Sequence, residues 1–371
     1  MIIGIDGNEA NIERRVGVNQ YAFELLWNIW KLQAIGETKH KLIVYLRENP
    51  RPDMPGETND FKYKVLPGRG MWILTKLMPE LFLTKEKPDI FFSPSHYIPP
   101  LAPMPRICSI MDLGYLEFSG QFTKKVFWQL KWWSAMSIFI SKRIISISNS
   151  TKDDIVRHYP FAKGKIYITP LGYDSKKFNI HISENDVRRV KNKYSIVDDY
   201  ILYLGTLKPS KNIEGLLEAY ATVHGISLVI AGKKGWMYGS IYEKAKRLGL
   251  NDEVVFTDFI PEEDKPRLIK GAKLFILPSF WEGFGLDALS AMASGVPVIV
   301  SNVGSLPEVV NGAGILVDPN SPKSIADGIK KVLSMTKSDY NSIVTKGLAQ
   351  AKKFSWEKTA RETLKIIENA N

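Results

Sequence analysis

The chain has 371 residues, of which 44 % are hydrophobic and 24 % are charged, and its formal net charge is +11. This length predicts two domains, and the composition is typical of a globular protein rather than a disordered or fibrous one. The lone Cys108 excludes an internal disulfide, which favours a reducing cytoplasm, and we interpret it as a small buried residue.

The first half of the chain predicts strands that alternate with helices. A helix is expected around Tyr21, and short apolar runs predict strands at 2–6, 41–46, 89–92, 107–110 and 143–148. Asp6, Ser93 and Asp112 follow three of these strands, at the edge where ligands collect in doubly wound sheets. The N-terminal residues contain neither a basic segment nor a long apolar segment after it, and no apolar run reaches the length of a membrane span. We therefore expect a cytoplasmic protein with neither a secretion signal nor a membrane span.

A basic and aromatic stretch extends from Phe118 to Lys152. It contains no Asp or Glu, and its lysines are interleaved with tryptophan and phenylalanine. One interpretation is a surface helix that binds an anionic membrane at its inner face, with Arg69, Trp72 and Lys76 extending the patch. The other is a buried helix with a basic rim. Both stay open, and with no nucleic-acid motif we expect no nucleic-acid partner.

The second half restarts the same pattern, which places a domain boundary near Asp174. Strands are predicted at 200–204, 227–232, 254–256, 273–277 and 296–300. Lys211 lies in the loop after the first of these strands, where a lysine can neutralise phosphate or merely be solvated. We therefore predict domains at 1–174 and 175–353, with a C-terminal helix at 354–371.

The most informative stretch is the segment 278–299. Its glycine-bearing loop leads into a helix predicted at 286–293, which Gly295 and Pro297 close. Gly283 and Gly285 allow the backbone to approach a ligand, and free N–H groups at a helix start suit a diphosphate. Glu282 beside such a site either binds ligand hydroxyls or supports the turn, and the residues alone favour neither interpretation.

A family resemblance is carried by Glu282-Gly283-Phe284-Gly285-Leu286 and the following Ala291-Met292-Ala293-x-Gly295-x-Pro297-Val298. These residues resemble the donor-site signature of retaining GT-B glycosyltransferases, the family 4-like glycosyl transferases group 1. The resemblance implies an α/β fold of two Rossmann-like, doubly wound parallel-sheet domains that face each other across a cleft. It also implies that the first domain binds the acceptor, that the second binds the nucleotide sugar, and that the C-terminal helix at 354–371 crosses back to the first domain.

The resemblance also implies roles for individual residues. It places Glu282 against the donor sugar, Lys211 and Thr206 at the diphosphate, and backbone groups of Ile260 at the base. Gly17 corresponds to a loop glycine over the diphosphate. The motif residues Gly283, Phe284, Gly285 and Leu286 complete the predicted donor site, with Ser290 at the ribose.

Three positions depart from the family pattern. Ser290 stands where the family has a second Glu, and Thr206 stands where many relatives have Arg. Met111 replaces the His of the family's usual His-Asp-Leu sequence. Asp112 corresponds to the Asp of that motif and is the third catalytic candidate, although capping a turn is the plainer role for it. Five scattered histidines show no ligand spacing, so we predict no metal.

The resemblance implies transfer of a mannose- or glucose-type hexose, with retention, from a GDP- or UDP-linked sugar. The acceptor would be a hydroxyl of a glycan or of a lipid-linked molecule in polysaccharide or glycolipid synthesis, and no further cofactor is expected. Two alternatives stay open. A non-catalytic sugar-nucleotide- or glycan-binding relative would explain Met111 and Ser290, and an RNA-binding or membrane-scaffold protein would explain the positive charge.

Overall fold

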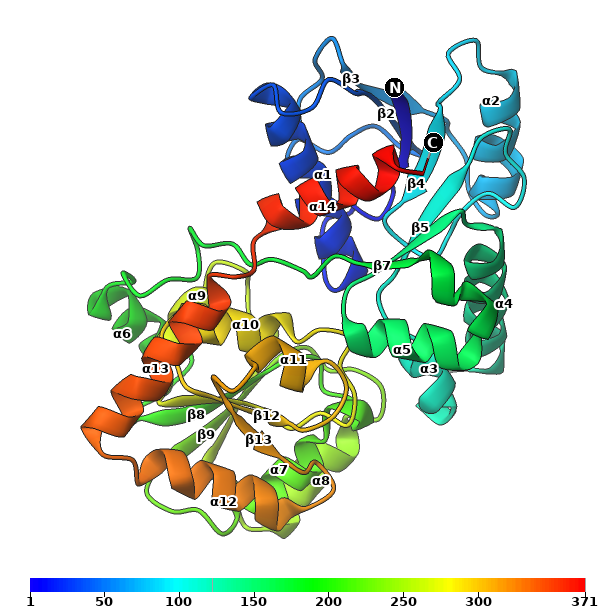
Figure 1. Ribbon diagram of the computed structural model, residues 1–371. Helices are drawn as coiled ribbons and strands as arrows, with labels where there is room; N and C mark the ends of the chain where they lie inside the picture. Colours follow the sequence, from blue (N-terminus) through cyan, green and yellow to red (C-terminus); the bar gives the residue numbers. More distant parts are fainter. Residues whose placement is uncertain (122, 371) are drawn as a thin grey trace. The chain divides into compact units, whose positions relative to one another are not determined.

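The computed structural model describes residues 1–121 and 123–370, and the chain forms two compact units. The first comprises Met1–Gly172 and Trp356–Asn371, and the second comprises Tyr173–Ser355. Each unit is a parallel sheet with helices on both faces (Figure 1). The predicted α/β class with two doubly wound parallel sheets is confirmed. None of the described helices is long and apolar enough to cross a membrane.

The first unit has seven strands in the order β3-β2-β1-β4-β5-β6-β7. They are β1 (Ile2–Asp6), β2 (Lys41–Leu46), β3 (Phe61–Val65), β4 (Ile90–Ser93), β5 (Arg106–Ile110), β6 (Arg143–Ser146) and β7 (Ile166–Ile168). The described helices are α1 (Val18–Ala34), α2 (Met78–Leu83), α3 (Gly114–Glu117), α4 (Lys124–Ile140), α5 (Asn149–His158) and α14 (Trp356–Glu368). Short π and 3₁₀ turns cover Ile73–Leu77, Ser119–Gln121 and Pro160–Lys165.

The second unit has six strands in the order β10-β9-β8-β11-β12-β13. They are β8 (Tyr200–Leu204), β9 (Ser227–Ala231), β10 (Val254–Asp258), β11 (Leu274–Leu277), β12 (Val298–Ser301) and β13 (Ile315–Val317). The helices are α6 (Glu184–Lys193), α7 (Ile213–Tyr220), α8 (Gly239–Arg247), α9 (Lys265–Lys270), α10 (Leu286–Ala293), α11 (Leu306–Val310), α12 (Pro322–Leu333) and α13 (Lys337–Ala351), with a 3₁₀ turn at Pro209–Lys211.

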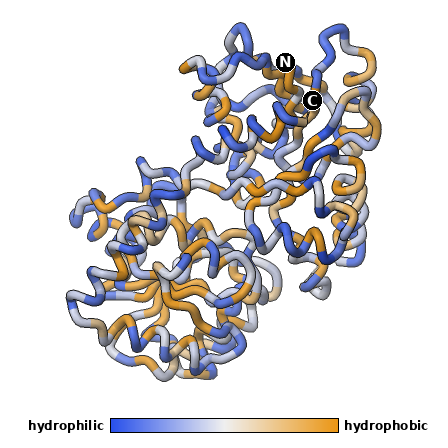
Figure 2. The backbone as a smooth tube through the Cα atoms, in the orientation of Figure 1, coloured by the Kyte–Doolittle hydropathy of each residue, from blue (hydrophilic) through white to orange (hydrophobic). Residues whose placement is uncertain are grey.

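The central strands of the second sheet are buried on both faces. Every residue of β8, β11 and β12 is buried, which is why these segments are continuous apolar runs in the sequence (Figure 2). One face is covered by α7, α8 and α12, with α7 packing against both of the others, and α10 packs against α9, α11 and α13. Because these strands are buried, the positions of the ends of β8 and β11 are fixed. The starting points of the loops that follow them are therefore fixed as well.

Helix α14 belongs to the first unit although it follows the whole of the second. The ring of Trp356 lies 6.4 Å from that of Tyr21 in α1. Arg361 forms a bidentate pair with Glu37, with nitrogen–oxygen distances of 2.7 and 2.9 Å. Thr359 donates its hydroxyl to the carbonyl of Pro170 at 2.6 Å. The end of the chain is therefore an integral part of the N-terminal unit.

Candidate functional site

Two loops meet where the strand order of the second sheet reverses. β8 lies between β9 and β11 in the sheet, so the chain turns away in opposite directions from β8 and β11. Ligands of doubly wound sheets bind in the crevice at the carboxyl ends of such a strand pair. The loop 205–212 follows β8, and the loop 278–285 follows β11. Most of the predicted donor-site residues lie on these loops or on α10.

Lys211 and Glu282 form an ion pair between the two loops. The Nζ of Lys211 lies 2.5 Å from the Oε1 of Glu282, although the residues are 71 positions apart. Both side chains are largely buried, with 17 % and 13 % exposed. Ser279, fully buried, donates its hydroxyl to the same oxygen at 2.8 Å. The structure thus brings together the two residues that the sequence placed at the diphosphate and the sugar.

The backbone of Glu282 is held from the next loop of the sheet. Ser305 donates to its carbonyl oxygen from both the hydroxyl, at 2.9 Å, and the backbone N–H, at 3.3 Å. A Cβ on Gly304 would lie 3.0 Å from that oxygen, and Gly304 has a φ of +62°. The loop after β12 therefore sets the position of Glu282, and only glycine suits position 304.

Asn212 fastens the two loops to each other, a role that sequence reasoning missed. It adopts a left-handed conformation with a φ of 54°. Its side-chain amide donates to the carbonyls of Pro278, at 3.0 Å, and Pro319, at 2.6 Å. Phe280 adds a backbone bond to Ser210 at 2.9 Å. Asn tolerates this conformation better than most residues, so an Asn directly after Lys211 was the available signal.

Helix α10 begins at Leu286, as predicted, and no side chain caps its first turn. Gly285 has a φ of +93°, and a Cβ there would lie 2.5 Å from the Cδ2 of Leu306. Gly285 is therefore required by the protein's own packing, and the expectation that it serves a close ligand approach is not needed to explain it. Gly283 and the buried Phe284 complete the turn. The N–H groups of the first turn are left without a side-chain acceptor.

The remaining predicted donor residues lie around this centre. Thr206 is in the same loop as Lys211, and its carbonyl accepts the hydroxyl of Tyr203 at 3.4 Å. Ile260 follows β10 and is buried, with 1 % of the residue exposed. Ser290 is 6 % exposed on α10, and its carbonyl accepts the hydroxyl of Ser294 at 2.9 Å. None of these three contacts Lys211 or Glu282 by a hydrogen bond that the structure defines.

Asp287 adds a carboxylate that the sequence reading passed over. It lies in the first turn of α10, three residues before Ser290. Burial raises the pKa of its carboxyl to about 6, with Glu282 and Glu262 acting in the same direction and Lys265 and Lys211 opposing them. An acidic residue only five positions after Glu282 is the sequence feature that could have indicated Asp287.

Gly17 and Asp112 belong to the first unit, apart from the other predicted site residues. Gly17 precedes α1 with a φ of 55°, and nothing would contact a Cβ there within 4 Å. Asp112 follows β5, and its Oδ1 accepts the backbone N–H of Gly114 at 2.9 Å. This contact is the turn-capping role that the sequence indicated.

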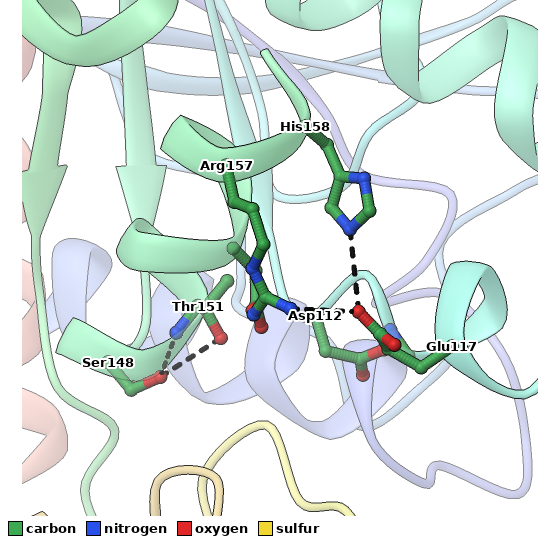
Figure 3. Close-up of polar contacts among 8 residues, drawn as sticks. Asp112, Glu117, Ser148, Thr151, Arg157 and His158 are labelled. Atoms are coloured by element: carbon green, nitrogen blue, oxygen red, sulfur yellow. Dashed lines mark hydrogen bonds and ion pairs between the residues drawn. The ribbon is translucent and has the colours of Figure 1, made fainter. Parts of the chain in front are cut away.

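An ion-pair network lies beside Asp112 (Figure 3). Arg157 of α5 reaches Glu117 at 3.1 Å and also pairs with Asp154, while His158 lies 3.6 Å from Glu117. Burial raises the pKa of Asp154 to about 6, with Arg157 opposing the shift. Glu117 and Arg157 therefore engage each other rather than Asp112.

Asp6, a buried carboxyl at the carboxyl end of β1, leads to a prediction about the pH dependence of stability. Asp6 is 6 % exposed, and burial raises its pKa from 3.8 to about 6 despite two hydrogen bonds from Asn8. The folded state binds this proton more tightly than the unfolded state, so Asp6 costs stability as the pH rises from about 4 to 6. Asp6→Asn should raise the free energy of unfolding by about 2 kcal/mol at pH near 7.5 and have little effect near pH 4.

Urea unfolding of both proteins across this pH range measures the difference, with the exposed Asp252→Asn as the matched control. A gain for Asp6→Asn that is the same at every pH would show that charge burial is not its source.

Among the described residues, no group of three or more His, Cys, Asp or Glu side chains is placed to hold a metal ion. The site instead offers an amine, carboxylates, hydroxyls and backbone N–H groups. This donor set suits an anionic ligand that also carries hydroxyls.

Known structures share this fold over nearly the whole chain. Sucrose-phosphate synthase from Thermosynechococcus elongatus superposes with a TM-score of 0.76 at 18 % identity, covering 99 % of this chain and 98 % of the other. HepE from Anabaena, in complex with UDP and glucose, gives a TM-score of 0.73 at 17 % identity and 99 % of each chain. At such identities the similarity establishes the GT-B fold alone.

Sequence comparison shows a similarity to one family over part of the chain. Residues 186–347 match the family described as "Glycosyl transferases group 1". The chain is 37 % identical over 235 residues to O-antigen chain mannosyltransferase B of Escherichia coli, an alignment that covers 62 % of this chain and 61 % of that relative. Residues 186–347 are therefore similar to the group 1 glycosyl transferases, and the fold of the chain is that of GT-B glycosyltransferases.

The family match covers the part of the chain that holds the loop pair. Lys211, Glu282 and Ser290 lie inside residues 186–347, whereas Gly17 and Asp112 lie outside them. The chain spans about three fifths of the length of the mannosyltransferase it matches. The recognition drawn from the motif at Glu282 is confirmed, and the roles of single residues stay predictions.

Proposed function

We propose that the chain transfers a mannose- or glucose-type hexose from a nucleoside-diphosphate sugar to a hydroxyl of a glycan or lipid-linked acceptor. The observation that carries the proposal is the Lys211–Glu282 pair, which lies in the loops beside the uncapped start of α10. A cation and free N–H groups fit a diphosphate, and a carboxylate fits sugar hydroxyls. We place this donor site on the second unit and the acceptor on the first.

The donor would change the partner of Lys211. In the structure, its Nζ is bound to Glu282 at 2.5 Å. A diphosphate carries more negative charge than one carboxylate and would attract this amine, which leaves Glu282 free to accept hydrogen bonds from the sugar. The pair would thus couple diphosphate binding to sugar positioning.

The proposed reaction proceeds with retention and without a metal. The bond from the anomeric carbon to the diphosphate breaks, and a bond from that carbon to the acceptor oxygen forms. The acceptor proton leaves with the nucleoside diphosphate. Lys211 and the first-turn N–H groups of α10 would stabilise the charge on the leaving diphosphate, and we assign Glu282 to sugar positioning rather than to covalent attack.

The names of similar proteins guide the choice of the donor sugars to test first. One relative is named as an O-antigen mannosyltransferase, and HepE was solved with UDP and glucose. We therefore propose a GDP- or UDP-linked hexose as the donor and polysaccharide synthesis as the context.

Calorimetric titration with GDP-mannose and UDP-glucose tests the proposal, followed by product analysis for any donor that binds. Binding to the natural protein, with slow release of free sugar, is the expected result. No binding by the natural protein together with binding by Ser290→Glu would contradict it.

A second function, sugar-nucleotide binding without catalysis, is favoured by one observation. Ser290 is short and uncharged where the family has a carboxylate, and it is buried on α10 with 6 % exposed. This function predicts that a nucleotide sugar binds and is recovered unchanged, even when glycan acceptors are added. The same titration and product analysis therefore separate the two functions.

A further inference from the structure

Helix α4 of the first unit is apolar on two faces. Its inner face packs on the core of the unit through Phe127, Leu130 and Ile138. An ordinary surface helix places polar side chains on the opposite face. In α4 that opposite face is also apolar, which calls for a second contact outside the described fold.

The outer face of α4 is a stripe of exposed aromatic residues. Trp128, Trp132 and Phe139 expose 49 %, 69 % and 70 % of their surface. From Lys125, the successive intervals to Trp128, Trp132 and Phe139 are three, four and seven residues. All four residues therefore lie along one side of the helix. We call Trp128, Trp132 and Phe139 the α4 aromatic face.

The apolar surface continues onto the turn after α5. Phe161, 56 % exposed, lies with its ring 5.8 Å from that of Phe139. Lys165 donates to the carbonyl of Phe139 at 2.8 Å, and its Nζ lies 5.7 Å from the centre of the Phe161 ring. The turn and the end of α4 therefore form one surface with cations at its edge.

Every charged side chain of α4 is a lysine, and the sequence from Phe118 to Lys152 contains no acid. The Nζ of Lys131 lies 5.0 Å from the centre of the Trp128 ring. Protein–protein interfaces are enriched in Arg and depleted of Lys, whereas Trp beside Lys is typical of helices that lie in a membrane interface. The composition therefore favours a lipid surface over a protein partner.

We propose that the α4 aromatic face and its lysines dock the first unit on an anionic lipid bilayer. The helix would lie in the plane of the interface, with the rings among the acyl chain boundaries and Lys124, Lys125 and Lys131 at the headgroups. No described helix can span a bilayer, which agrees with a surface mode. The inference does not depend on the proposed transferase function.

The structure corrects one part of the expected patch. Trp72 is 7 % exposed, and its Nε1 donates to the carbonyl of Leu66 at 2.7 Å. It belongs to the core beneath α2 and cannot reach a membrane. Arg69 and Lys76, in contrast, are exposed.

Co-sedimentation with vesicles tests the proposal on the full chain. We expect binding to mixed phosphatidylcholine and phosphatidylglycerol vesicles and little to phosphatidylcholine alone. Replacing Lys124, Lys125 and Lys131 with Glu should weaken the binding by about 100-fold, because each lysine near an anionic surface contributes about fivefold. Replacing Trp128 and Trp132 with Ala should also weaken it, at unchanged net charge.

Two matched controls use the second unit. Lys331, Lys346 and Lys353 are exposed, and changing these three to Glu alters the net charge equally. Trp236, 54 % exposed, serves as the aromatic control in Trp236→Ala. Equal losses in the α4 variants and these controls would overturn the proposal, as would binding to RNA but not to vesicles. Thermal unfolding of each variant shows whether it is folded.

Discussion

Replacing Glu282 with Gln will reduce glycosyl transfer by at least about 100-fold while nucleoside-diphosphate binding persists. Gln keeps the size of the side chain and can still accept the hydrogen bond from Ser279, which measures 2.8 Å in the natural protein. It loses the charge that pairs with Lys211. Lys211 then stays available to a diphosphate, but the proposed donor sugar site loses its charged hydrogen-bond acceptor.

Initial rates with the donor identified by calorimetry, together with binding of the free diphosphate, measure the two effects separately. Glu243→Gln on the exposed side of α8 is the matched control. If Glu282→Gln turns over normally, Glu282 only supports the turn. If it loses diphosphate binding and thermal stability together, its role is structural.

Replacing Lys211 with Met will weaken nucleoside-diphosphate binding by about 10-fold or more and reduce transfer further. A charge-assisted hydrogen bond contributes about 1.5–3 kcal/mol, and this amine is held between the two loops by its contact with Glu282. Met has a similar length without the charge. The effect on transfer exceeds that on binding because the diphosphate gains charge as the sugar leaves.

Lys208→Met, in the same loop, separates this role from a general loss of positive charge. Calorimetry should show a much smaller effect for Lys208→Met than for Lys211→Met. The reverse order would mean that Lys208 binds the phosphates and that Lys211 is only the structural partner of Glu282.

The sheet centres could be predicted from the sequence because they are buried on both faces. β1, β8 and α10 begin and end where the apolar runs and glycines indicated. β3 was missed, since Phe-Lys-Tyr-Lys-Val alternates with lysine, as an edge strand does. Trp72 was placed on the surface wrongly, because composition does not reveal which side of a helical turn faces the core.

The site could be predicted only in part. The motif around Glu282 indicated the loop and the helix, but its ion pair spans 71 residues and depends on β8 lying beside β11. Strand order is a long-range property that local patterns do not contain. The contacts of Asn212 and Ser305 depend on it too, since both bond to backbone carbonyls of distant loops.

The return of α14 to the first unit has a consequence for the order of folding during synthesis. The ribosome releases Trp356–Glu368 after all of Tyr173–Ser355, so the second unit can complete its structure while the first still lacks a helix. Until then, the surface of α1 around Tyr21 stays without the ring of Trp356. The nascent N-terminal unit would therefore expose apolar surface for the time needed to translate the whole second unit, and it is the part that a chaperone would bind.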